Sequence, residues 1–105
     1  MRRRSKYGNV RVIVDGHKFD SKREARRYGE LRLLQRAGKI SDLLLQVRFP
    51  LAVNGHVICA YVADFDYREG SRRVTEDVKG VRTAVYRIKA KLMKSLHGIT
   101  IREIE

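Results

Sequence analysis

The sequence predicts a single mixed α/β domain in which two helices pack on a sheet with antiparallel and parallel pairs. At 105 residues, the chain is long enough for one hydrophobic core and too short for two. Segments of β type follow one another through the middle of the chain and are joined by turn sequences, which indicates an antiparallel meander. A segment of helical period then separates the meander from a final strand, and this order implies a parallel pairing.

The first part of the chain predicts a hairpin and a helix. Residues 10–19 alternate in β fashion around Asp15-Gly16, a strong two-residue turn signal. We expect this hairpin to lead into the domain rather than to form its core. The first helix is expected from Asp20-Ser21 to Ala37-Gly38, because Ser21 suits an N-cap and Gly38 suits a left-handed C-terminal cap.

The remaining elements follow from turn residues and hydrophobic period. Pro50 cannot donate a ladder hydrogen bond, so its strand should occupy an edge or contain a bulge. Asn54-Gly55 predicts a tight hairpin turn, and Gly80 ends the last strand of the meander. The expected strands are 40–53, 56–67 and 73–79, followed by a helix at 83–96 and a strand at 99–104.

The second helix is amphipathic by its 3.6-residue period. The row expected to pack on the sheet is Val85, Ile88, Leu92 and Leu96. The cations expected on the opposite face, where they would suit phosphates, are Arg87, Lys91 and Lys94. Lys89 projects between apolar positions, so it either extends to the surface or reaches a bound phosphate.

Charge indicates a polyanionic partner. The chain carries 24 Lys and Arg against 12 Asp and Glu, a net charge of +12. Such a charge on a small domain favours nucleic acid, although a solvated basic surface is the alternative. Residues 1–8 form a basic arm that is expected to be flexible alone and to settle on phosphates, or else to be a frayed terminus. The cations of this arm are Arg2, Arg3, Arg4 and Lys6.

Several other classes of protein are excluded or disfavoured. Cys59 is the only cysteine, so neither an intrachain disulfide nor a cysteine-based zinc site can form. No long apolar run is present, and the N-terminal sequence lacks the apolar region of a signal peptide. We therefore expect a cytoplasmic protein with no membrane partner.

Asp64 and Asp77 are expected to meet near the ends of two paired strands. Segments 61–67 and 74–80 alternate apolar and polar residues in β fashion. If they pair as a hairpin, Asp64 can lie close to Asp77, and Lys79 shares the strand face of Asp77. Converging carboxylates repel unless a hard cation lies between them, and Mg²⁺ prefers oxygen ligands. We expect the chemistry here; a surface ion-pair network is the alternative.

Glu24 has two alternative roles, which the sequence leaves open. In the capping box Ser21-Lys22-Arg23-Glu24, the carboxylate would fold back on the Ser21 amide. Glu24 also shares a helical face with Tyr28 and Leu31, and this face should lie against the sheet. Its carboxylate would then point toward the site.

These residues together resemble the PD-(D/E)XK nuclease superfamily. Asp64 looks like the first aspartate of its motif, although Ala63 replaces the usual proline, and Asp77-Val78-Lys79 looks like the (D/E)-x-K triplet. Glu24 occupies the place of the helix glutamate found in many members. Residues 19–80 are also similar to a small phage-encoded nuclease family, and to the small, basic, dimeric Holliday junction resolvases of archaeal type.

The resemblance implies a restriction-endonuclease-like core at residues 9–105 and a metal-dependent mechanism. The implied ligands of Mg²⁺, for which Mn²⁺ can substitute, are Glu24, Asp64, Asp77 and the carbonyl of Val78. Lys79 would stabilise the transition state and orient or help deprotonate the attacking water. Asp66, on the strand face of Asp64, is the second choice of metal ligand. Gln46 is a candidate to contact the ligand side chains without binding the metal itself.

We therefore expect a structure-selective DNA endonuclease, specifically a Holliday junction resolvase. Two opposed nicks resolve a junction, so a homodimer with one site in each subunit is expected. DNA would be held through its phosphates by the arm and by the second helix. The alternatives are a nicking or duplex endonuclease of the same superfamily and a basic nucleic-acid-binding module without catalysis.

Overall fold

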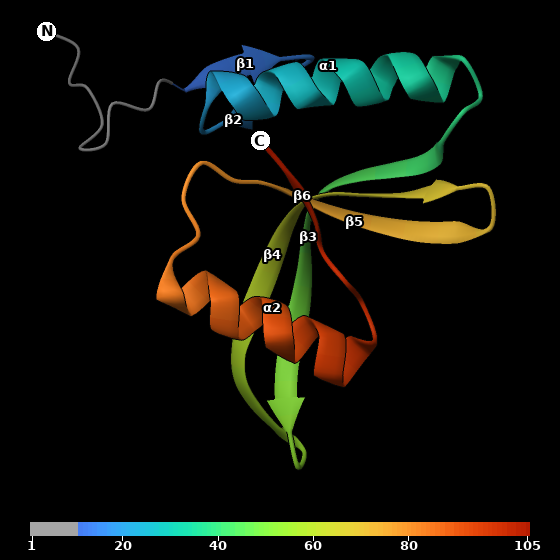
Figure 1. Ribbon diagram of the computed structural model, residues 1–105. Helices are drawn as coiled ribbons and strands as arrows, with labels where there is room; N and C mark the ends of the chain where they lie inside the picture. The colour runs from blue at the N-terminus through green and yellow to red at the C-terminus, as the bar shows by residue number, and fades with distance from the viewer. Residues whose placement is uncertain (1–10) are drawn as a thin grey trace, which may run out of the picture.

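The computed structural model describes residues 11–105. This part of the chain forms the predicted mixed α/β domain, with two helices, a sheet of four strands and a small separate hairpin (Figure 1). Its elements, in order, are β1 (Val12–Val14), β2 (His17–Phe19), α1 (Lys22–Arg36), β3 (Ser41–Val53), β4 (His56–Glu69), β5 (Arg72–Val78), α2 (Ala84–His97) and β6 (Arg102–Ile104). Neither helix is both long and apolar enough to cross a membrane.

The sheet has the predicted mixed topology. Its strand order is β3-β4-β5-β6; the first three strands pair antiparallel, and β5 pairs parallel with β6. The edge position of Pro50 is confirmed, since β3 lies at one side of the sheet, and the register shifts nearby between Leu51 and Ala52. The expected turns also form: both residues of Asn54-Gly55 have positive φ angles, 51° and 80°, as a tight hairpin turn requires.

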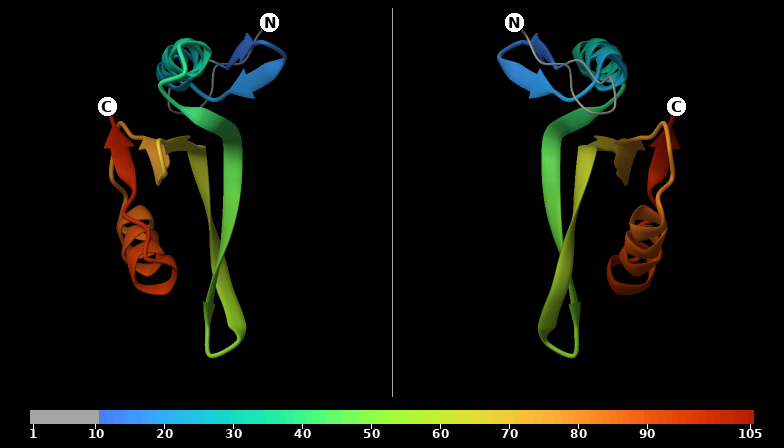
Figure 2. Two further views of the ribbon diagram at one scale, coloured as in Figure 1. Left: turned by 90° about the vertical axis from the view of Figure 1, so that its right-hand side faces the viewer. Right: turned by 90° about the vertical axis from the view of Figure 1, so that its left-hand side faces the viewer.

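Two hydrophobic cores lie at different parts of the sheet. In Figures 1 and 2, α1 and the β1–β2 hairpin lie over one end, while α2 lies alongside the long β3–β4 pair. The core under α1 consists of Phe19, Tyr28, Leu31, Ile40, Phe65, Tyr67 and Val74. The core under α2 consists of Phe49, Leu51, Tyr61, Ala63, Tyr86 and Met93.

The strand pair changes from one core to the other at Asp64. Ala63 packs with α2, whereas Phe65 packs with α1. Residues two apart on a regular strand share a face, so the alternation is interrupted between them. Gln46 lies opposite Asp64 in the β3–β4 register and has a φ angle of 52°. This left-handed residue in a strand accounts for a local bend, and the bend places Asp64 at the junction of the two cores.

The N-terminal hairpin contributes more to the core than the sequence indicated. Phe19 is only 1% exposed, and its ring lies 5.1 Å from that of Tyr28 and 6.5 Å from that of Phe65, measured between centroids. The expectation that this hairpin stays outside the core is therefore wrong for Phe19. An aromatic side chain at the end of β2 closes the space between α1 and the sheet.

Helix α2 presents a different face to the sheet from the one predicted. Val85, Ile88 and Leu96 are exposed by 61%, 60% and 39%, whereas Tyr86 and Met93 are buried. Of the predicted row, Leu92 alone packs partly against the core. The helix carries two apolar rows, and the row with the larger aromatic side chain, Tyr86, faces the sheet.

Candidate active site

Asp64 and Asp77 lie on neighbouring antiparallel strands, as the sequence predicted. Phe65 pairs with Glu76 at the end of the β4–β5 ladder, and Asp64 and Asp77 are the residues directly beyond this pair on the two strands. The Asp64 Oδ2 accepts a 2.8 Å hydrogen bond from the Val78 backbone N–H. Val78 is in turn fixed by parallel pairing with Ile104 of β6. The parallel strand added after α2 therefore holds the backbone that orients Asp64.

Lys79 is held between a carboxylate and an aromatic ring. Its Nζ lies 3.3 Å from Asp77 Oδ1 and 4.3 Å from the centroid of the Tyr86 ring, close enough for a cation–π interaction. Asp77 is 3% exposed and also accepts a hydrogen bond from the Tyr61 hydroxyl. The ammonium of Lys79 is thus positioned from two sides beside the carboxylates.

Burial and neighbouring charges raise the pKa values of Asp64 and Glu24. Burial raises the pKa of Asp64 to about 7; the Val78 N–H opposes this rise, while the carboxylates of Glu24 and Asp77 add to it. Burial also raises the pKa of Glu24, assisted by Asp20 and Asp77, whereas Lys79 lowers it. Glu24 of α1 therefore belongs to the electrostatic surroundings of Asp77 and Lys79.

The two roles considered for Glu24 use different parts of the residue. Its backbone N–H donates to Ser21 Oγ at 3.1 Å, so the predicted N-cap is present. Its carboxyl is influenced by the carboxyl and ammonium groups of the site. The cap requires the backbone of Glu24, which leaves the carboxyl available for another task.

The donor chemistry of this cluster fits a hard divalent cation. Asp64, Asp77 and Glu24 supply carboxylate oxygens, which Mg²⁺ and Mn²⁺ favour. Burial and, to a smaller extent, neighbouring carboxylates raise the pKa of Asp64, and a bound cation would offset both by favouring the ionised form. Within residues 11–105, no three His, Cys, Asp or Glu side chains already form an arrangement that could hold a metal ion.

Asp66 and Gln46 have other surroundings in the structure. Both carboxylate oxygens of Asp66 accept from Arg73 Nε, at 3.1 and 3.0 Å, and Oδ2 also accepts from Thr75 Oγ1 at 2.8 Å. These bonds give buried Asp66 a structural task. Gln46 lies opposite Asp64 in the register, and its side chain lines a pocket between α1 and β3.

Three side chains of this region were not singled out from the sequence. Tyr61 and Tyr86 contact Asp77 and Lys79, as described above. Arg23 lies against the backbone of Gly80, because a Cβ atom placed there would be 3.0 Å from Arg23 Nη1. The available signals were the glycine directly after Lys79 and the position of Arg23 beside Glu24 in the first turn.

A buried ion pair on the α1 side of the sheet was also missed. Glu76 is fully buried and accepts two hydrogen bonds from Arg27, at 2.8 and 2.7 Å, and one from the Tyr67 hydroxyl. This bidentate pair joins α1 to β5. It therefore fixes the helix that carries Arg23 and Glu24 relative to the strand that carries Asp77.

The cations expected to contact phosphates fall into two groups. Arg2, Arg3, Arg4 and Lys6 lie outside the described residues. On α2, Arg87, Lys91 and Lys94 are exposed, and Lys89 is half-buried.

The fold and the site define a small basic α/β domain with a carboxylate–lysine cluster where its sheet bends. Residues 4–102 match the model of a family described as "Protein of unknown function (DUF1064)". The chain therefore belongs to the DUF1064 family. Comparison with curated proteins and with solved structures gives no match.

Proposed function

We propose that this protein is a metal-dependent DNA endonuclease of the PD-(D/E)XK type. The observation that carries the proposal is the position of Lys79, whose Nζ lies 3.3 Å from Asp77, the carboxylate that in turn neighbours Asp64. An ammonium group next to paired carboxylates supplies the opposite charges that phosphodiester hydrolysis uses. The net charge of +12 supports a polyanionic substrate.

The residues have separate tasks in this proposal. Asp64, Asp77, Glu24 and the Val78 carbonyl would hold Mg²⁺ or Mn²⁺. The bound cation supplies acidification of water and neutralisation of the negative charge that develops on phosphate. Lys79 donates a hydrogen bond to a phosphoryl oxygen or to the attacking water, and Asp77 and Tyr86 fix its position. Arg23, at the backbone of Gly80, adds a second cation for the phosphate.

The proposed substrate is a four-way DNA junction, as in Holliday junction resolution during recombination. Two opposed nicks need two sites, so the active species would be a homodimer. The N-terminal arm and the exposed cations of α2 would bind phosphates, which positions DNA without reading its sequence. A DNA-processing role places the protein in the cytoplasm, that of the host cell if a phage encodes it.

A binding module without catalysis is the second candidate function. The ion pair between Lys79 and Asp77 and the cation–π contact with Tyr86 also stabilise the fold by themselves. A basic domain with such a network would still bind nucleic acid. The two candidates differ in cleavage and in its dependence on Asp64.

A cleavage assay separates these functions. Supercoiled plasmid, linear duplex and a four-way junction are incubated with the protein, with and without Mg²⁺. Wild type should cut the junction only with metal, and Asp64→Asn and Asp77→Asn should lose cleavage while retaining binding. Asp42→Asn is a matched control, since Asp42 is an exposed aspartate of β3. Wild-type rates in either active-site variant would refute the proposal; cutting of duplex or plasmid in preference to junction would identify a duplex or nicking enzyme.

A further inference from the structure

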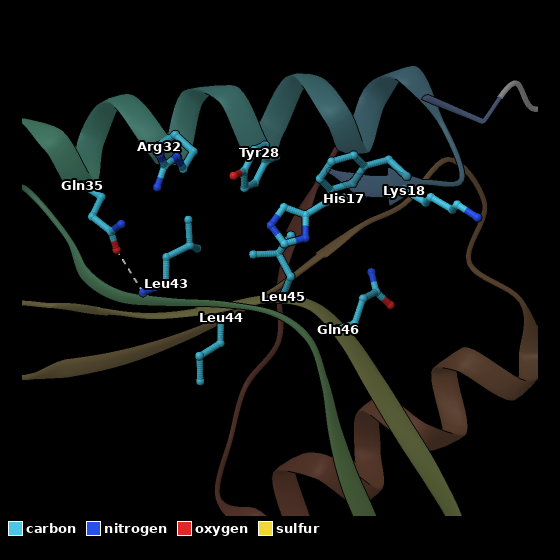
Figure 3. A pocket seen from close by; sticks show the side chains of 10 residues that line it. His17, Lys18, Tyr28, Arg32, Gln35, Leu43, Leu44, Leu45 and Gln46 are labelled. Atoms are coloured by element: carbon cyan, nitrogen blue, oxygen red, sulfur yellow. Dashed lines mark hydrogen bonds between the residues drawn. The ribbon is translucent and has the colours of Figure 1, made fainter. Parts of the chain in front are cut away.

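A pocket separate from the carboxylate cluster lies between α1 and β3. Its volume is about 470 Å³, within the range of about 300–1,000 Å³ that is typical of small-ligand sites. The lining residues include His17, Lys18, Tyr28, Arg32, Leu45 and Gln46. Figure 3 shows Arg32 and Gln35 at one end, Lys18 and Gln46 at the other, and His17, Tyr28 and Leu45 between them.

Arg32 has hydrogen-bonding capacity directed into this region. Its buried Nε has no hydrogen-bond partner within residues 11–105. Asp15 is the nearest carboxylate, but its Oδ2 lies 3.8 Å from this nitrogen and already accepts from the Tyr28 hydroxyl at 3.0 Å. A buried donor without a partner is costly, so an anionic oxygen in the pocket would satisfy it.

The middle of the pocket suits a flat, partly apolar group. Tyr28 is 3% exposed and forms its wall, and the exposed His17 ring meets the Tyr28 ring edge-on at 5.6 Å between centroids. Leu45 lies on the opposite wall (Figure 3). Aromatic and aliphatic surfaces of this kind stack with nucleobases, and the amide groups of Gln35 and Gln46 can hydrogen-bond to base edges.

The pocket also borders the carboxylate cluster. Gln46 lines the pocket and lies opposite Asp64 on the neighbouring strand; such strands are about 4.8 Å apart. Gln46 adopts its positive φ of 52° at this point, and strained residues of this kind cluster at ligand sites. A nucleic acid strand bound at Asp64 would therefore lie one β-strand away from a residue of the pocket.

We propose that this pocket binds one nucleoside monophosphate unit, with its phosphate toward Arg32 or Lys18 and its base beside His17 and Leu45. The unit is either an unstacked nucleotide of a bound DNA strand or a free nucleotide. The first source rests on the proposed function, because it requires DNA to be the partner. A nucleotide that is already unpaired enters such a pocket at a lower cost than a paired one.

Two probes distinguish the sources, both in metal-free buffer containing EDTA. The first is a four-way junction with 2-aminopurine at the branch point, whose fluorescence rises when the base leaves the stack. The second is free dTMP, followed by the amide shifts of the ¹⁵N-labelled full-length protein. The pocket variants are Arg32→Gln and His17→Ala. Their matched controls are Arg36→Gln, on the same helix, and His56→Ala, at the tip of the β3–β4 hairpin.

The strand-bound form predicts a fluorescence rise that both pocket variants reduce and both controls retain. The free form predicts dTMP-induced shifts at residues 17–18 and 43–46, with binding about tenfold weaker in Arg32→Gln, as expected for a lost charge-assisted hydrogen bond. Thermal melts establish whether each variant is folded. If Arg32→Gln does not fold, His17→Ala alone tests the pocket. The inference is overturned if neither probe responds, or if the pocket variants behave like their controls.

The outcome is separable from that of the proposed function. Metal-dependent cleavage lost in Asp64→Asn, together with unresponsive probes, would retain the nuclease and reject the pocket. Conversely, dTMP binding that depends on Arg32, with no cleavage of any DNA, would retain the pocket and reject the nuclease.

Discussion

Replacement of Asp64 by asparagine should stabilise the metal-free protein at alkaline pH. Burial and neighbouring carboxylates raise the pKa of Asp64 to about 7, whereas the ordinary value is 3.8. The folded protein thus binds this proton more tightly than the unfolded chain. Folding stability from this group is fully present below about pH 4 and is lost as the pH rises through 7. The raised pKa of Glu24 acts in the same direction.

The magnitude follows from the proton affinity. Each pKa unit between the folded and unfolded states corresponds to about 1.4 kcal/mol of folding free energy. The loss of folding stability caused by Asp64 is therefore at most about 4 kcal/mol. The carboxyl is partly accessible to solvent, and screening reduces the value; we expect about 2 kcal/mol. Asparagine is neutral and nearly isosteric, and its oxygen can still accept from the Val78 N–H. The variant should therefore gain this amount over wild type at pH 8.5 and little at pH 3.5, below the ordinary pKa of the carboxyl.

Urea unfolding followed by circular dichroism measures the difference. Wild type and Asp64→Asn are compared in EDTA at pH 3.5 and at pH 8.5, with Asp42→Asn as the control for an exposed carboxylate. Addition of Mg²⁺ at pH 8.5 should raise the unfolding midpoint of wild type but not of Asp64→Asn. Equal stability differences at both pH values would show that folding does not raise the pKa of Asp64, and the reasoning would fail.

Three further predictions concern the site, the core and the arm. Glu24→Gln should lose cleavage at a nearly unchanged melting temperature, because the cap uses the Glu24 backbone; normal cleavage would reduce Glu24 to a capping residue. Met93→Ala should cost about 2–5 kcal/mol in urea unfolding, whereas Ile88→Ala, at an exposed position, should cost less than about 0.5 kcal/mol; the reverse order would restore the helix face predicted from sequence. Deletion of residues 1–6 should flatten the salt dependence of DNA affinity, measured by fluorescence anisotropy in Ca²⁺, by about 0.9 per lost phosphate contact, and an unchanged slope would exclude the arm from binding.

The sequence alone determined the elements and their connections. Asp15-Gly16 and Asn54-Gly55 adopt positive φ angles at both residues of each turn, and Ser21 caps α1. Pro50 lies in an edge strand, because proline lacks a ladder donor wherever it is placed. These outcomes depend on backbone sterics and on hydrogen bonds between residues close in the chain, so the local sequence contains them.

The approach of Asp64 to Asp77 was also predictable, whereas the choice between Asp64 and Asp66 was less so. Both aspartates have the same strand parity and similar neighbours in sequence. In the structure, Asp66 accepts hydrogen bonds from Arg73 and Thr75. Asp64 accepts one from the Val78 N–H. Alternation along a strand cannot separate them, because their partners come from another strand.

The orientation of α2 and the bend of the sheet were decided only by the tertiary structure. The helix has two apolar rows, and its period cannot rank them; the row of Tyr86 is buried because that ring packs 6.4 Å from the ring of Tyr61, between centroids. Glutamine does not favour the left-handed region, so the residues around Gln46 in the sequence do not predict its positive φ angle. The strand pair serves two cores, Asp64 lies between Ala63 of one core and Phe65 of the other, and Gln46 lines the neighbouring pocket. Contacts between residues distant in the chain supply the energy for both features, and a sequence pattern read along the chain does not contain them.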